Sequence, residues 1–369
     1  MNHNQALQIE KLKSGLSSRE CEKIDDFFKC LDERTELPFV GKTSLIHHFI
    51  EAFEYYQDQG KETEEICELI HPDYLGNFYS ESQRQYYSLD NAAIIYPLGM
   101  KYGQMPMFRL SAELTEEVRP HILQMALNFT IKRFPTFSSV VKRGFFWHYL
   151  ETVHTIVKVE EENDIPCKPI SIFLRGARSF RILYYKKRIS VEFFHVLTDG
   201  SGGMVFLKTL LAEYFDLLGT LVSVGQGVMD IAEKPDPEES SNEFWKAEGK
   251  GNFQTFMEKS SLQMDGKLSS INPVRIIHFE MDADQLKQTA HRYHGTVTSY
   301  LLAIEFMAAQ KACSKDGMFN IQVPVNMRKF NGSRTLRNYS MYFFVSQSIR
   351  DLPDKEELVR QMNEQIHER

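Results

Sequence analysis

A histidine, an aspartate and a short glycine-rich run lie close together near the middle of the chain. In residues 193–203, FFHVLTDGSGG, His195 ends an apolar run typical of a strand, and Asp199 follows four residues later. Gly200 begins a glycine-rich turn that leads into a helical pattern. Imidazole titrates near neutrality and can take a proton from a hydroxyl, amine or thiol. This order predicts a general base at the rim of a sheet, beside a carboxylate in a tight turn that glycines make at positive φ.

The alternation of side chains before the histidine indicates where the imidazole points. Successive side chains of a strand point to opposite faces, so Ile189, Val191 and Phe193 share one face with His195. That face is apolar and is expected to pack against the core. The imidazole should therefore point inward at the edge of the core, where its surroundings can control its tautomer.

Other chemistries fit these residues less well. A metal site is not expected, because His195 and Asp199 have no further ligands at zinc spacing nearby. A Ser-His-Asp hydrolase would need a G-x-S-x-G elbow, which is absent, and Ser201 lies too near His195 in the sequence to be its nucleophile. The glycine run lacks the P-loop lysine and the Rossmann spacing, which favours a tight turn over a phosphate site.

Four segments are expected along the chain. Residues 1–80 are polar with helical periodicity and predict an N-terminal helical extension. Residues 81–219 predict an α/β lobe that carries the histidine motif, and residues 220–273 a polar, proline-containing crossover linker. Residues 274–369 predict a second lobe. The final helical pattern is still in register at the last residue, so this lobe is expected to be truncated.

Hydrophobic periodicity places the elements within the two lobes. Strands of the first lobe are expected at 107–114, 137–142, 145–150, 181–185 and 189–195, with helices at 115–134 and after the glycine run as far as Gly219. Strands of the second lobe are expected at 275–281, 321–325 and 339–346, with helices at 284–293, 297–313 and 354–369.

The composition limits the partners and the compartment. The 369 residues are 42% hydrophobic and 25% charged, which is an ordinary globular composition. The formal net charge of −7 argues against a nucleic-acid partner. Five cysteines are scattered without a C-x-x-C pair and are expected to be reduced thiols. No signal peptide and no apolar run of membrane-spanning length is seen, so we expect a cytoplasmic protein.

The segment FFHVLTDGSGG resembles the His-x-x-x-Asp-Gly motif of the coenzyme A-dependent acyltransferase superfamily. That superfamily includes chloramphenicol acetyltransferases, plant BAHD acyltransferases, peptide synthetase condensation domains and bacterial alcohol acetyltransferase-like proteins, of which the last group is the most similar. Over residues 85–369 further segments recur in that group's order: YSLDNAA, FRLSAEL, RFPTF, RGFFWHYLE, GTVTSYLLA and IQVPVNMRKF.

The resemblance implies a fold and a reaction. The fold would be a two-lobed α/β sandwich like that of chloramphenicol acetyltransferase, with mixed sheets and flanking helices, to which the helical extension is added. The reaction would transfer an acyl group, expected to be acetyl, from acyl-CoA to a small alcohol or amine. Acyl-CoA would be a co-substrate, and no bound cofactor is expected.

The resemblance also assigns roles to residues. His195 would be the general base. Asp199 would hold the loop with Gly200 by pairing with an arginine, of which Arg328 is the first choice and Arg109 the second. Asn338 matches a position where related enzymes place channel-lining residues, although a core or turn asparagine fits equally well.

The chain also departs from its relatives. Phe194 stands where condensation domains usually have the first of two histidines, and the Asp-Phe-Gly-Trp-Gly motif of BAHD enzymes is absent. An alternative therefore stays open, in which the chain is a non-catalytic or carrier-protein-dependent condensation-type module that binds acyl thioesters.

Overall fold

The computed structural model describes residues 2–80, 84–99, 105–145, 147–171, 178–246, 261–263 and 276–368. The chain divides into two compact units. The first comprises Met1–Ala247 together with Met327–Tyr339, and the second comprises Glu248–Asn326 with Ser340–Arg369. The first 80 residues thus belong to the same compact unit as the lobe with the histidine motif. So does a short segment from the last third of the chain.

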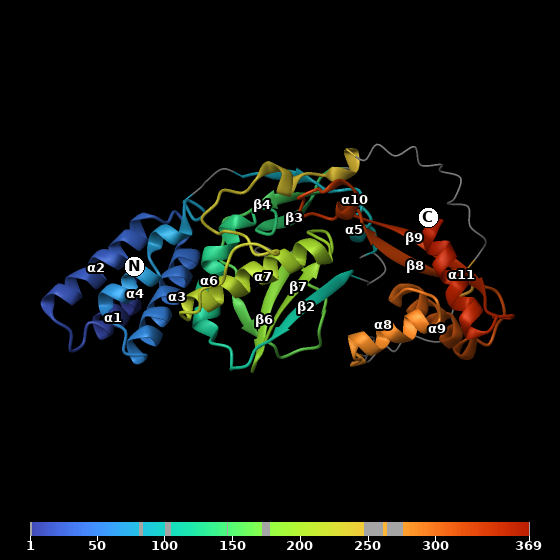
Figure 1. Ribbon diagram of the computed structural model, residues 1–369. Helices are drawn as coiled ribbons and strands as arrows, with labels where there is room; N and C mark the ends of the chain where they lie inside the picture. Colours follow the sequence, from blue (N-terminus) through green and yellow to red (C-terminus); the bar gives the residue numbers. More distant parts are fainter. Residues whose placement is uncertain are drawn as a thin grey trace. The chain divides into compact units, whose positions relative to one another are not determined.

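Helices form the N-terminal part of the first unit (Figure 1). They are α1 (His3–Leu12), α2 (Ser18–Glu33), α3 (Phe39–Asp58) and α4 (Thr63–Leu69), followed by the 3-10 helix η1 (Pro72–Leu75). Asn2 and Ser17 begin α1 and α2 with capping boxes, which satisfy backbone N–H groups at the helix ends. α3 packs on α6 (Pro120–Thr130), where Phe49 meets Phe129 edge to face. The extension therefore shares its hydrophobic core with the lobe.

A four-stranded mixed sheet carries the histidine motif. Its strands are ordered β2 (Met107–Glu113), β7 (Arg188–Phe194), β6 (Phe180–Tyr185) and β5 (Val159–Glu161). β5 runs parallel to β6, and the other neighbours are antiparallel. α6 and α7 (Gly200–Leu217) pack against each other and against this sheet. Phe193 from β7 and Phe206 from α7 are fully buried between them, so the strand before His195 is held firmly.

A second, three-stranded sheet has the order β1 (Tyr86–Ser88), β4 (His148–Thr152) and β3 (Ser139–Arg143). The first unit also contains α5 (Tyr96–Gly99), α10 (Arg328–Asn331) and the 3-10 helices η3 (Ile131–Arg133), η4 (Pro237–Ser240) and η5 (Glu243–Trp245). Glu239 in η4 is buried and pairs with Arg133 in η3. The described residues of the expected linker, 220–246, therefore pack within the first unit.

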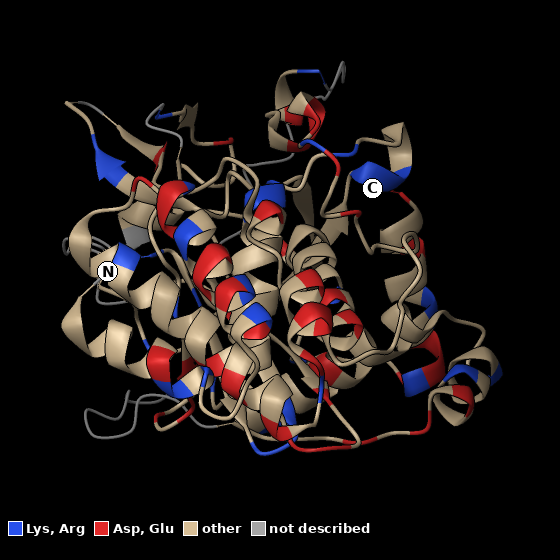
Figure 2. Cartoon of the chain, turned by 90° about the vertical axis from the view of Figure 1, so that its left-hand side faces the viewer, with Lys and Arg blue, Asp and Glu red and all other residues tan. Residues whose placement is uncertain are grey.

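Acidic and basic side chains are interspersed on the surface formed by the N-terminal helices. Figure 2 shows this face, on which Lys and Arg are interspersed with Asp and Glu. Exposed ion pairs such as that between Lys23 and Glu64 join neighbouring helices. No helix in the described part of the chain is long and apolar enough to cross a membrane.

The second unit contains α8 (Ala283–Arg292), α9 (Val297–Ala312), β8 (Met318–Asn326), β9 (Ser340–Ser348) and α11 (Lys355–His367). β8 and β9 pair antiparallel along their whole length. Thr296 begins α9 with a capping box, as the sequence predicts. The strand expected at 275–281 is not formed, because residues 276–281 have no regular structure and expose their apolar side chains; residue 275 lies outside the described residues.

Candidate active site

The end of β7 and the start of α7 place the two motif residues. β7 ends at Phe194, and the His195 N–H continues the strand pairing by donating to the Pro106 carbonyl oxygen at 2.9 Å. Asp199 begins α7 as its N-cap, and its Oδ1 accepts from the N–H groups of Ser201 (3.1 Å) and Gly202 (3.2 Å). Three residues thus separate the imidazole at the strand end from the carboxylate at the helix start.

The imidazole of His195 is half-buried between aromatic rings. Tyr96 stacks on it with ring centroids 4.7 Å apart and an interplanar angle of 28°. Phe108, from the neighbouring strand β2, lies against it at 4.9 Å. Burial, together with the negative charges of Asp90 and Asp199, raises the pKa of Tyr96 to about 12, so its phenol stays protonated at neutral pH. The imidazole is therefore held by one stacked and one tilted aromatic contact, which leave its nitrogens to polar partners.

Asn338 binds His195 through both ends of its amide. Its Nδ2 donates to the backbone oxygen of His195 at 2.9 Å, and its Oδ1 lies 2.9 Å from Nδ1 of the imidazole. A carbonyl oxygen accepts only, so the NH₂ group must face the His195 backbone and Oδ1 must face the ring. Nδ1 consequently carries the proton, which leaves the lone pair on Nε2. Among the residues that the structure describes, none hydrogen-bonds to Nε2.

The same amide also contacts a buried ion pair. Asn338 Nδ2 lies 3.2 Å from Oδ2 of Asp90, a residue with 0% exposure. Arg337 places its Nη2 3.5 Å from that oxygen, and the Ala93 N–H donates to Oδ1 at 2.8 Å. Burial raises the pKa of Asp90, while the charge of Arg337 and the N–H donors oppose the rise. Consecutive hydrogen bonds thus join the imidazole to the Asn338 amide and the amide to the Asp90 carboxylate.

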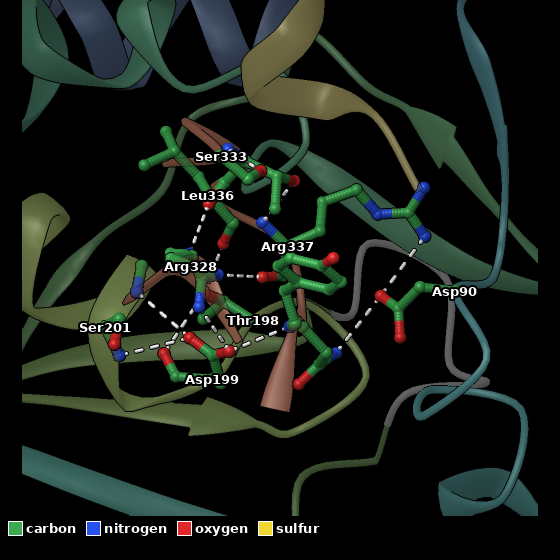
Figure 3. Close-up of polar contacts among 12 residues, drawn as sticks. Asp90, Thr198, Asp199, Ser201, Arg328, Ser333, Leu336 and Arg337 are labelled. Atoms are coloured by element: carbon green, nitrogen blue, oxygen red, sulfur yellow. Dashed lines mark hydrogen bonds and ion pairs between the residues drawn. The ribbon is translucent and has the colours of Figure 1, made fainter. Parts of the chain in front are cut away.

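Asp199 faces Arg328, as the sequence analysis expected, and not the imidazole. Arg328 Nη1 lies 2.8 Å from Asp199 Oδ2, and the Tyr339 N–H donates to the same oxygen at 2.9 Å (Figure 3). Arg328 also donates from Nε to the Thr335 carbonyl oxygen at 2.8 Å and from Nη2 to that of Arg337. Burial opposes ionisation, but Arg328 and the N–H donors hold the pKa of Asp199 below its usual value. The pair ties the loop after β7 to residues 328–339.

The second-choice partner, Arg109, lies elsewhere. Its guanidinium contacts Glu162 at 2.6 Å and the fully buried Glu192 at 3.1 Å. Arg181 also pairs with Glu192, so these charges form their own network across β2, β7 and β6. Arg109 is therefore part of the sheet and not of the Asp199 loop.

The backbone conformation at the glycines of the motif is ordinary, and what matters is the room that a missing side chain leaves. Gly200, Gly202 and Gly203 all lack the positive φ that the sequence analysis expected of the turn. A Cβ on Gly202 would meet the Leu336 carbonyl oxygen at 2.1 Å, whereas a Cβ on Gly200 would meet nothing within 4 Å. Glycine is thus required at 202 so that the segment with Asn338 can approach the loop. Thr198 Oγ1 donates to the same Leu336 oxygen at 2.5 Å.

Within the described residues, no group of three or more His, Cys, Asp and Glu side chains could hold a metal ion. A cavity of about 820 Å³ in the first unit is lined by Phe78, Tyr87, Lys132, His154 and Pro235 among others, and His195 is not part of its lining. The chemistry available at His195 is therefore that of an oriented imidazole with a lone pair on Nε2.

Solved structures share this architecture. The chain superposes on the first condensation domain of the calcium-dependent antibiotic synthetase with a TM-score of 0.53 at 13% identity, covering 77% of this chain and 73% of that one. Polyketide synthase associated protein 5 from Mycobacterium tuberculosis gives 0.52 at 13% identity, with 76% and 72% covered. The chain has a condensation-domain-like fold.

This condensation-domain-like fold confirms the mixed α/β architecture predicted from the sequence. The EpoB cyclization-docking bidomain from Sorangium cellulosum matches with a TM-score of 0.51 at 13% identity over 77% of this chain. The chain spans 64% of that bidomain's length. No protein-family model matches the sequence, and no curated protein matches it significantly. At these identities the likeness establishes the fold.

Three residues of the site were not singled out from the sequence. Asp90 and Arg337 are buried charges whose pairing joins positions almost 250 residues apart, and no local pattern indicates such a contact. Tyr96 begins the short helix α5, in a segment rich in exposed apolar residues that gives no chemical signal. For Asn338 the sequence left a channel position and a core or turn position open, and the structure places it in the core, 1% exposed and bonded to His195.

Proposed function

We propose that this protein is an acyltransferase that moves an acyl group from a thioester to an alcohol or amine, with His195 as general base. The observation that carries the proposal is the orientation of the imidazole. Asn338 holds Nδ1 in its protonated form, so Nε2 keeps the lone pair that a base needs. The condensation-domain-like fold and the ordered motif segments support the same reaction class.

The proton and electron pairs balance in the proposed step. Nε2 takes the proton from the acceptor O–H or N–H while the acceptor oxygen or nitrogen bonds to the thioester carbon. The carbon–sulfur bond then breaks, and the imidazolium returns its proton to the departing thiolate, which leaves as a thiol. Asp199 and Arg328 contribute by holding the loop and need not contact the reacting atoms.

Coenzyme A is our first choice of thioester carrier. The test is thiol release from acetyl-CoA and longer acyl-CoAs with a panel of alcohols and amines. We expect His195→Ala to lower kcat by roughly 10²–10⁴-fold, which is the usual contribution of a general base. His121→Ala, which changes an exposed histidine of α6, is the matched control and should keep the wild-type rate. Equal rates for His195→Ala and wild type would contradict the proposal.

A carrier-protein thioester is the second candidate donor. It is favoured by the fold neighbours, one of which is named as a condensation domain of an antibiotic synthetase and another as a polyketide synthase associated protein. If the wild type ignores acyl-CoA and uses only acyl-phosphopantetheine attached to a carrier protein, this candidate replaces the first. Calorimetric binding of acyl thioesters with no turnover from either donor would instead indicate a non-catalytic module.

A further inference from the structure

We propose that Asp90 is a positioning residue for His195, acting through the amide of Asn338 and held in place by Arg337. The inference rests on the proposed function, because it names the group that keeps the proposed base in its working tautomer. Asp90 lies before α5 and Asn338 before β9, so the sequence alone does not bring them together.

The first argument concerns the hydrogens of the Asn338 NH₂ group. One is directed to the His195 backbone oxygen at 2.9 Å and the other to Asp90 Oδ2 at 3.2 Å. Asn338 is 1% exposed, so water does not replace a lost acceptor easily. Both acceptors demand the same orientation of the amide, and Asp90 is the one that can be altered by substitution of a side chain.

The second argument concerns the two oxygens of Asp90. Oδ1 accepts from the Ala93 N–H at 2.8 Å, while Oδ2 faces Asn338 Nδ2 and lies 3.5 Å from Arg337 Nη2. A carboxylate satisfies donors on both sides, but the amide of an Asp90→Asn variant cannot, because one of its ends is itself a donor. If the oxygen of the introduced amide stays with Ala93, its NH₂ group meets that of Asn338 and pushes the Asn338 amide to turn over.

A turned amide has a direct effect on the base. The NH₂ group of Asn338 would then face the imidazole, and Nδ1 would have to accept a hydrogen bond instead of donating one. The proton would move to Nε2, and the ring would lose the lone pair that the proposed reaction uses. The negative charge of Asp90 has a second role. It lies on the far side of the Asn338 amide from the ring, where it would stabilise the imidazolium that forms during the reaction.

The experiment measures the tautomer directly. Nitrogen-15 NMR of the full-length protein, with the His195 signals assigned by comparison with His195→Gln, requires no substrate. We expect the proton on Nδ1 in the wild type and a substantial Nε2–H population in Asp90→Asn. The matched control is Glu239→Gln, which replaces a buried carboxylate paired with Arg133 in the same unit and should leave the tautomer unchanged.

Kinetics give the second readout. Asp90→Asn should lower kcat by roughly 10- to 100-fold with KM within about twofold, because the lost group acts on the base and not on binding. Glu239→Gln should lower the thermal unfolding midpoint as much as Asp90→Asn does, but it should not lower kcat. A wild type with Nε2–H, or an Asp90→Asn protein whose tautomer and kcat equal those of Glu239→Gln, overturns the inference.

Two further outcomes are distinguished. If Asp90→Asn does not fold, Asp90→Asn combined with Arg337→Gln removes both buried charges together, and an unchanged tautomer in that protein also overturns the inference. If the wild type transfers no acyl group from any donor, the proposed function fails, while the tautomer measurement still decides what Asp90 does to the ring.

Discussion

The carbonyl oxygen of Leu336 occupies the place where a side chain on Gly202 would begin, 2.1 Å from an ideal Cβ. The close approach joins the first turn of α7 to the segment that carries Asn338 and Arg337. Backbone cannot yield as a flexible side chain can, so any larger residue at 202 must separate the two segments.

Gly202→Ala is therefore expected to destabilise the first unit and to displace Asn338 from His195. Overpacking of this kind typically lowers the free energy of unfolding by about 1–3 kcal/mol. We expect a loss at the upper end of this range, because the clashing atom belongs to the backbone. Gly200→Ala, two residues earlier, meets no atom within 4 Å and should leave stability within about 0.5 kcal/mol of the wild type. Urea unfolding of the two variants makes the comparison, and equal losses would contradict it.

The Asp199–Arg328 pair should make stability depend on acid pH. The pKa of Asp199 is lowered in the folded state, so its stabilising contribution is present above its ordinary value of 3.8 and is lost as pH falls through the lowered one. Asp199→Asn should cost about 3–5 kcal/mol at neutral pH because it removes the negative charge that faces the largely buried Arg328 guanidinium. The difference between variant and wild type should shrink below pH ~4, as measured by urea unfolding across pH.

Glu213 should give the opposite pH dependence. Burial, with the nearby charge of Asp216, raises the pKa of this α7 carboxyl to about 7, against the attraction of Lys132. Its contribution to stability is complete below its ordinary pKa of 4.5 and is lost as pH rises through about 7. Wild-type stability should therefore fall by up to about 1.4 kcal/mol per pH unit across that range. Glu213→Gln should lack this fall, and parallel curves for the two proteins would refute it.

The aromatic ring of Tyr96, and not its hydroxyl, is expected to position the imidazole, because the two rings stack with their centroids 4.7 Å apart. Tyr96→Phe should keep kcat within about threefold of the wild type. Tyr96→Ala should lower kcat by roughly tenfold or more, because the imidazole of His195 would be free to move. Steady-state kinetics with the best acceptor decides this. A large loss in Tyr96→Phe would instead give the hydroxyl a part in the reaction.

Much of the first unit could be predicted because its signals are local. The alternation before His195 predicted β7, and the helix expected after the glycine run as far as Gly219 is α7. Arg328 was found through an ordered set of motif segments and not through any property of its own neighbourhood.

The rest of the site depends on contacts that no local pattern encodes. Asp90 reaches Asn338 across 248 positions, and its burial is visible only once the chain is folded. The apolar residues of 276–281 resembled a strand, but a strand also needs a pairing partner, and that segment has none among the described residues. Local propensity could not reveal either fact.

The composition of the first unit has a consequence for the order of events during synthesis. Residues 1–247 contain the sheet, the helices and the histidine itself, but Arg328 and Asn338 belong to a segment made much later. Most of the unit is therefore synthesised before Asn338, which orients the imidazole, and Arg328, which holds the loop. In the nascent protein, His195 and Asp199 therefore lack the partners Asn338 and Arg328 until residues 327–339 have been synthesised.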